Sequence, residues 1–142
     1  MSEQDFHGAK AAVFIGEDLL VYQRDRGVRW PGYWDFPGGG RENTETPQEC
    51  LSREVFEEFG LSLTDSDFTW GCAVRAMTDA TQAAWFFAVH LPPDAQSLIR
   101  FGDEGQCWAV MPVRDVMNMP NLVPALRNRL SLWLHESGVN PI

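Results

Sequence analysis

Three glutamates on one face of an expected helix give the clearest chemical signal in this sequence. Glu57 and Glu58 follow Glu54 by three and four positions, and side chains at these separations are neighbours on a helix surface. Two carboxylates ~6 Å apart repel by roughly 2–3 kcal/mol at an effective dielectric of about 20. In open water screening removes most of this repulsion, and glutamates on a helix usually form a solvated face. In a cleft the repulsion must be relieved by protonation or by cations, and carboxylate oxygens suit a hard cation such as Mg²⁺.

Start and stop signals define the helix that carries these glutamates. Thr46 can serve as the N-cap, Pro47 occupies the first helical position, and Glu49 completes a capping box. Gly60 suits the left-handed position that follows a helix end. We therefore predict a helix over residues 47–59, entered from a glycine-rich loop. Its core-facing stripe consists of Leu51, Val55 and Phe59.

The glutamates belong to a longer pattern, G-x5-E-x7-R-E-U-x-E-E-x-G-U, in which U is aliphatic. Its fixed positions here are Gly39, Glu45, Arg53, Glu54, Val55, Glu57, Glu58, Gly60 and Leu61. This stretch resembles the Nudix box at every fixed position, and residues 34–39 resemble the W-D-x-P-G-G entry common in that family. The resemblance implies a hydrolase that splits a nucleoside diphosphate linked to another group, X.

Metal binding is the first role that the resemblance implies. The cofactor would be Mg²⁺, with Mn²⁺ as a substitute. The ligands would be the box glutamates, the carbonyl before the box glycine and the glutamate of a late E-G-Q stretch, namely Gly38, Glu54, Glu57, Glu58 and Glu104. From the residues alone, Glu104 would be an ordinary exposed loop residue, and Asp103 could take its place.

Catalysis would need a base for the attacking water. Glu54 or Glu104 would take the proton or orient the water, and both assignments stay open. Such a base adds about 10²–10⁴-fold to a rate. Glu45 and Arg53 usually pair in the family and hold the loop against the helix, so Arg53 joins the catalytic set in a supporting role.

Substrate contacts are predicted from cations, the glycine loop and one aromatic segment. Arginines can clamp phosphates, although a single surface arginine more often forms an ion pair. Trp34 and Phe36 would either line a base pocket or cover the core. Asn121 would read a base edge or act as a helix N-cap. The resulting substrate-binding set is Arg24, Arg26, Phe36, Gly39, Arg41 and Asn121.

The order of elements favours a nucleoside triphosphate as substrate, cut to a monophosphate and pyrophosphate. Nucleotide-sugar and dinucleotide pyrophosphatases form the first alternative. Dinucleotide hydrolases of the family tend to carry a tyrosine about sixteen residues past the box, and no tyrosine follows Tyr33 here. A regulatory module that binds nucleotides without catalysis forms the second alternative, but such modules typically lose box glutamates.

Composition limits the partners and the compartment. The chain has 142 residues and a net charge of −9, with Lys10 as its single lysine, which argues against a nucleic acid polymer or an anionic membrane as partner. The longest apolar run, residues 83–89, is too short to span a membrane. Three widely spaced cysteines favour reduced thiols and a cytoplasmic location. A small-molecule nucleotide is the expected partner, and a homodimer is compatible with the family.

The hydrophobic pattern predicts a single α/β domain over residues 1–142, with a loosely held start at 1–7. Apolar runs rich in β-branched and aromatic residues predict strands at 9–15, 19–23, 68–77, 82–91 and 106–111. Helical spacing predicts a brief turn at 112–116 and a last helix at 122–135, and residues 92–103 should form a loop. Periodicity alone gives mixed α/β, and the resemblance implies a Nudix-type α/β/α sandwich with a mixed β-sheet.

Overall fold

A mixed sheet forms the centre of the computed structural model, which describes residues 5–137. Its strands, in chain order, are β1 (Gly8–Ile15), β2 (Asp18–Gln23), β3 (Trp34–Asp35), β4 (Gly38–Gly40), β5 (Phe68–Arg75), β6 (Ala83–Leu91) and β7 (Cys107–Met111). The path β3-β2-β1-β6-β5 runs through the sheet, β4 pairs with β1, and β7 pairs with β2. The pairing of β1 with β6 is parallel and the others are antiparallel.

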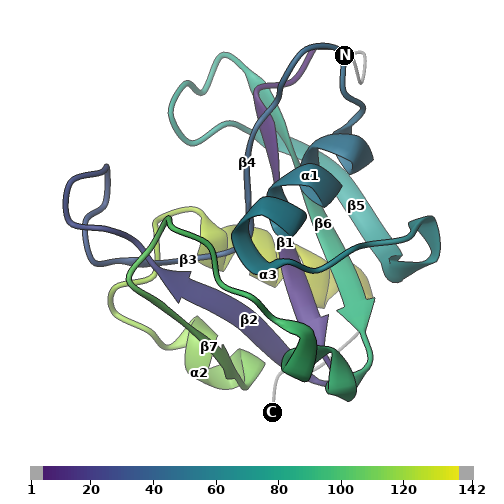
Figure 1. Cartoon of the computed structure of the whole chain (residues 1–142). Coiled ribbons are helices and arrows are strands. Elements are labelled where there is room, and N and C mark those ends of the chain that lie inside the picture. The colour runs from purple at the N-terminus through teal and green to yellow at the C-terminus, as the bar shows by residue number, and fades with distance from the viewer. Residues whose placement is uncertain (1–4, 138–142) are drawn as a thin grey trace.

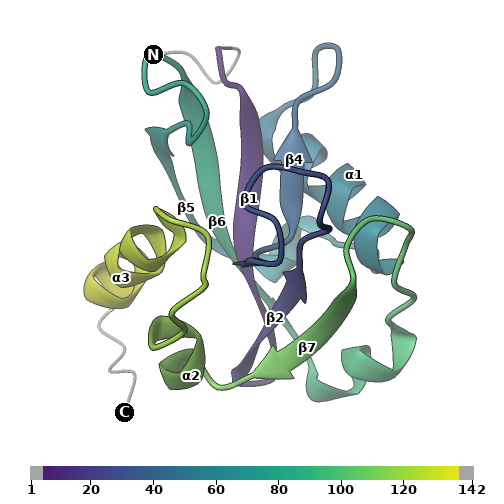
Figure 2. The same cartoon turned by 90° about the vertical axis from the view of Figure 1, so that its left-hand side faces the viewer.

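Helices cover both faces of this sheet. The α-helices are α1 (Pro47–Phe59), α2 (Val113–Met117) and α3 (Leu126–Ser137), and two 3₁₀ turns, η1 (Asp65–Asp67) and η2 (Pro93–Leu98), lie in the connections. Helix α1 lies over one face and α3 over the other, as the two perpendicular views show (Figures 1 and 2). The predicted α/β/α sandwich is therefore confirmed.

The alternation of side chains along β1 explains the two cores. Ala11, Val13 and Ile15 pack in the cluster that contains Leu51, Val55 and Phe59 of α1. Ala12 and Phe14 point to the opposite face and pack with residues of α3, as the period of two in a strand requires. Because this strand is buried on both sides, its sequence is a nearly continuous run of apolar residues.

Helix α1 agrees with its sequence signals at both ends. The Thr46 hydroxyl accepts a hydrogen bond from the Glu49 backbone N–H, and the Glu49 carboxylate accepts one from the Thr46 N–H. Gly60 ends the helix in the left-handed conformation, with φ of 69°. The helix that carries the box glutamates is thus fixed at both termini.

Several predicted boundaries are wrong. Helix α3 begins at Leu126 because the preceding segment pairs with β3: Leu122 forms a bridge with Trp34, and the Val123 N–H donates to the Trp34 carbonyl. The predicted strand at 68–77 ends at Arg75, since the Ala76 N–H closes a turn with the Gln82 carbonyl. Strands β3 and β4 replace part of the expected loop.

The beginning of the chain also differs from the predicted loose start. Phe6 is buried in the α1-side core, and the His7 N–H donates to the Ala83 carbonyl. Residues 1–4 of that prediction lie outside the described residues. Within residues 5–137, no helix has the length and apolar character needed to cross a membrane.

Candidate active site

Helix α1 presents its glutamates to β4. The apolar stripe of Leu51, Val55 and Phe59 is fully buried, which fixes the rotation of the helix about its axis. Glu54 and Glu58 are then turned toward the three glycines of β4. A methyl group built at Gly39 would lie 2.5 Å from the Glu54 carboxylate. The lack of a side chain at this position lets the helix and the strand approach closely.

Glu58 is the most buried of the three glutamates, with 8% of its surface exposed. Its Oε1 accepts a hydrogen bond of 2.9 Å from the Gly38 backbone N–H. Burial raises the pKa of its carboxyl to about 8, although Lys10 and the Gly38 N–H oppose this shift. A buried carboxylate with a raised pKa and no ion-pair partner among residues 5–137 has the character expected of a cation ligand.

Glu54 and Glu57 lie closer to solvent. Burial raises the pKa of Glu54, while the neighbouring Arg53 lowers it and Glu57 raises it further. The Glu57 side chain is 55% exposed and lies 3.1 Å from the Arg53 guanidinium. These two carboxylates are therefore held near one another by a shared cation and remain accessible.

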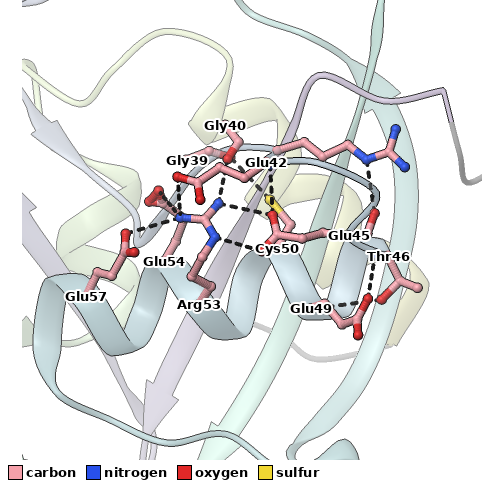
Figure 3. Close-up of polar contacts among 11 residues, drawn as sticks. Gly39, Gly40, Glu42, Glu45, Thr46, Glu49, Cys50, Arg53, Glu54 and Glu57 are labelled. Atoms are coloured by element: carbon pink, nitrogen blue, oxygen red, sulfur yellow. Dashed lines mark hydrogen bonds and ion pairs between the residues drawn. The ribbon is translucent and has the colours of Figure 1, made fainter.

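Arg53 ties the glycine strand and its following loop to α1 (Figure 3). Its Nε donates to Glu45 Oε2 at 2.7 Å, and its Nη2 donates to the Gly40 carbonyl at 2.8 Å. The same hydrogen bond to Arg53 is the main cause of a lowered pKa at Glu45. The predicted Glu45–Arg53 pair is present, and its geometry suits support of the loop because both partners are engaged with each other.

Five carboxylates line one cavity of about 220 Å³, which we call the acidic cleft. They are Glu54, Glu57, Glu58, Asp103 and Glu104. The fold thus brings Glu104, about fifty positions away in sequence, to the box glutamates. As they stand, no three acidic, histidine or cysteine side chains of residues 5–137 are arranged to hold a metal ion. Glu58 accepts a hydrogen bond from Gly38, and Glu54 and Glu57 accept hydrogen bonds from Arg53, but each carboxylate keeps further lone pairs for a cation.

A second cavity, of about 180 Å³, lies on the other side of Gly39, and we call it the cationic cavity. Its charged lining residues are Lys10, Arg24, Arg29, Asp35 and Arg129. Asp35 is fully buried and pairs with Lys10 at 3.0 Å and with Arg24 at 2.8 Å. Its Oδ2 also lies 3.3 Å from the Tyr22 hydroxyl, whose pKa is raised chiefly by burial and then by Asp35.

The predicted substrate residues fall in different places. Arg24 and Gly39 line the cationic cavity. Arg26 is exposed and lines neither cavity, while Arg41 donates from Nε to the Glu45 carbonyl and stacks 4.5 Å from the Phe6 ring. Arg41 therefore holds the loop in this structure.

Phe36 and Asn121 require correction. Phe36 is fully buried and stacks on Phe86 in the α3-side core, so the core role holds and no surface is left for a base. Asn121 is not a helix N-cap, because α3 begins five residues later. Its Nδ2 lies 3.5 Å from the Gly32 carbonyl, in the loop that leads to β3.

Sequence reasoning missed Lys10, Asp35 and Arg129 as residues of the site. A signal was present for Lys10, the only lysine, because it interrupts an otherwise apolar strand and therefore has to find a buried anion. Asp35 stands in the W-D-x-P-G-G stretch, but that resemblance gave it no role, and Arg129 gave no comparable signal because its partners come from elements far away in sequence.

Comparison with known proteins agrees with this geometry. The family description "NUDIX domain" matches residues 5–134. This chain belongs to the NUDIX family. The Nudix-box resemblance is thereby confirmed, and the similar proteins include ones named as diphosphatases and pyrophosphohydrolases, although this chain spans less than half the length of several of them.

Individual NUDIX relatives differ in how much of the chain they match. The nucleoside triphosphatase NudI of Escherichia coli O139:H28 is 33% identical over 76% of this chain and 80% of its own length. The 8-oxo-dGTP diphosphatase of Proteus vulgaris is 40% identical over 33% of this chain, which spans only 42% of that relative. The crystal structure of a MutT protein from Methanosarcina mazei Go1 has a TM-score of 0.67 at 19% identity, covering 96% of this chain and 99% of that one.

Proposed function

We propose that this NUDIX protein is a divalent-metal-dependent hydrolase of nucleoside triphosphates that releases a monophosphate and pyrophosphate. The observation that carries the proposal is the adjacency of the acidic cleft and the cationic cavity at Gly39. A polyphosphate chain needs cations beside the reacting phosphorus, and its nucleoside needs a separate pocket. The similarity to the nucleoside triphosphatase NudI and to the 8-oxo-dGTP diphosphatases supports this substrate class.

The acidic cleft would supply both the metal ligands and the base. The proposed ligands of Mg²⁺ or Mn²⁺ are the Gly38 carbonyl, Glu54, Glu57, Glu58 and Glu104. A bound ion would neutralise phosphate oxygens and lower the pKa of a bound water. Glu54 or Glu104 would accept the proton of the attacking water as its oxygen bonds to phosphorus. The phosphoanhydride bond breaks in the same displacement, and the leaving phosphate keeps the electron pair.

The test is a panel of nucleotides with Mg²⁺, in which products are identified. We expect pyrophosphate and a nucleoside monophosphate from a triphosphate. A sugar phosphate or two monophosphates as the best-formed products would favour nucleotide sugars or dinucleotides instead. Tight nucleotide binding with no turnover would contradict catalysis and favour a regulatory module.

A matched variant pair assigns turnover to the acidic cleft. Glu57→Gln should lower kcat by about 10²-fold or more at saturating Mg²⁺, because it removes a proposed metal ligand. The fold should survive, since the Glu57 side chain is 55% exposed, and circular dichroism checks this. Glu17→Gln, in the exposed turn between β1 and β2, is the control that should keep wild-type turnover. Wild-type turnover by Glu57→Gln would remove this residue from the mechanism.

We further propose a reducing, cytoplasmic compartment. Cys50, Cys72 and Cys107 are all free thiols, and Cys50 is fully buried. Burial raises the pKa of the Cys50 thiol to about 11, which makes it unreactive. Localisation of the tagged protein in its own cells tests this proposal.

A further inference from the structure

Arg129 is a buried cation whose donors are mostly unused. It lines the cationic cavity from α3, and only 6% of its surface is exposed. Its Nη2 donates to the Arg75 carbonyl at 2.8 Å. Within residues 5–137 its guanidinium forms no other hydrogen bond and no ion pair. A guanidinium has five N–H donors and cannot accept, so most of its donors are available to a ligand.

Two other cations of this cavity, Lys10 and Arg24, are only partly buried and already have partners. Lys10 and Arg24 both pair with Asp35, and Lys10 also donates to the Phe36 carbonyl. Asp35 is therefore paired with two other cations. No carboxylate of residues 5–137 lies at ion-pair distance from Arg129. The unpaired guanidinium nitrogens of Arg129 are not among the fully buried unpaired side-chain atoms of residues 5–137, so they keep solvent access at the cavity, where an acceptor on a ligand can reach them.

The rest of the lining suits a flat aromatic group. The lining includes the apolar side chains of Ala76, Met77, Ala84 and Val123 and the ring of Trp30. Trp30 has φ of 53°, a left-handed conformation that is rare for an aromatic residue and often marks a functional position. A volume of about 180 Å³ is below the roughly 300–1,000 Å³ of pockets for whole drug-sized ligands, so it fits one part of a nucleotide.

We propose that Arg129 is a specificity-determining residue that selects bases carrying a carbonyl, rather than an amino group, at C6 of a purine or C4 of a pyrimidine. This proposal rests on the proposed function and names the substrate class of the same site. A carbonyl oxygen accepts from the guanidinium, and in a 6-oxopurine N7 adds a second acceptor in a bidentate geometry. An amino group at the same position is itself a hydrogen-bond donor, so it would face the guanidinium N–H donors without offering an acceptor.

Matched substrate pairs test the selection. ITP and ATP differ in the group at C6 and in the N1 proton that accompanies the carbonyl, and UTP and CTP differ in the group at C4 and in the corresponding N3 proton. We expect kcat/KM to favour the carbonyl member of at least one pair by about 5- to 150-fold, which corresponds to one good bidentate contact. Arg129→Met should bring that ratio close to one. An equal preference in the wild type, or a ratio unchanged in Arg129→Met, would overturn the proposal.

A purely structural role for Arg129 predicts a different result. If the residue only attaches α3 to β5 through the Arg75 carbonyl, Arg129→Met lowers the melting temperature and all four rates by a common factor. The same common factor is expected if Arg129 contacts phosphate, because phosphate is shared by all nucleotides. Arg127→Met is the matched control on the same helix. Arg127 donates to the Met117 and Met119 carbonyls and does not line the cavity, so this variant should keep the substrate ratio.

Binding of the monophosphates separates this inference from the proposed function. Calorimetry with IMP against AMP, and UMP against CMP, requires no turnover. A carbonyl preference that is lost in Arg129→Met would support the inference even if no triphosphate is hydrolysed. Hydrolysis without any carbonyl preference in either assay would sustain the proposed function and refute the inference.

Discussion

Glu58 has opposite effects on stability and on metal binding. Its carboxyl is buried beside β4, its one hydrogen bond comes from the Gly38 N–H, and the nearby Glu54 and Asp35 charges add repulsion. These surroundings raise its pKa from 4.5 to about 8, which means that the fold without metal favours the protonated form. A site built to receive a cation is destabilised in its absence, which is the usual relation between function and stability.

The pH dependence of stability follows from this pKa. Because the folded value lies above the unfolded one, the stabilising contribution of the Glu58 proton is complete below about pH 4.5 and is lost as pH rises through about 8. Glu58→Gln keeps an acceptor for Gly38 without a charge, so in a chelator it should melt on the order of 5 °C above wild type at pH 9. The difference should shrink toward pH 5. Thermal unfolding across this range measures it, with Glu17→Gln as control. Parallel curves for wild type and Glu58→Gln would contradict the assignment.

Strand β4 uses its glycines for two different purposes. Gly38 has φ of 139°, and a methyl group there would lie 2.2 Å from the Ala9 carbonyl oxygen and 2.5 Å from the Lys10 Cα. Both obstacles belong to the backbone of β1 and cannot move independently. At Gly39 the obstacle is the carboxylate of Glu54, the end of a flexible side chain. The lack of a side chain at Gly38 therefore allows β4 to pack closely on β1, and the lack of a side chain at Gly39 leaves room for the Glu54 carboxylate.

Alanine at these two positions should separate stability from activity. Gly38→Ala should destabilise the protein by more than about 2 kcal/mol, because backbone strain and overlap coincide. Gly39→Ala should change stability far less, yet lower kcat by about 10²-fold, since Glu54 must turn away from its place in the cleft. Denaturant unfolding and steady-state kinetics on both variants measure the contrast. Full activity in Gly39→Ala would show that the position of Glu54 is not critical.

Local sequence signals predicted helix α1, whose capping residues lie at its own ends. They missed the elements that exist only because they pair with segments far away in sequence. Helix α1 was predicted at both ends because Thr46, Glu49 and Gly60 act within the helix itself. Strands β3 and β4 have two and three residues and lack a β-branched alternation, so only their pairing with β2 and β1 defines them. Helical spacing at Leu122 and Val123 was overridden by pairing with Trp34. The box glutamates were predicted as metal ligands because the whole motif lies within one continuous stretch of sequence, whereas Arg129 belongs to no such motif.

Across the whole molecule, acidic side chains line one of the two cavities and mainly basic side chains line the other. Five carboxylates line the acidic cleft, and no cation of residues 5–137 lines it. The cationic cavity has Lys10, Arg24, Arg29 and Arg129 against the single carboxylate of Asp35. The protein carries a net charge of −9. A polyphosphate would be repelled from the acidic cleft unless divalent cations bind there first, so the charge pattern makes binding depend on metal.

Divalent metal should therefore stabilise the whole fold. At a concentration 100 times its Kd, a ligand that binds only the folded protein adds about 2.7 kcal/mol, which raises the melting temperature by roughly 5–10 °C at this size. MgCl₂ and NaCl compared at equal ionic strength separate specific binding from screening of the net charge of −9. The double variant Glu57→Gln/Glu58→Gln should lose the Mg²⁺ effect and keep the response to NaCl. An equal rise with both salts, or a full Mg²⁺ effect in the double variant, would place the stabilising ion elsewhere and leave the acidic cleft without its cation.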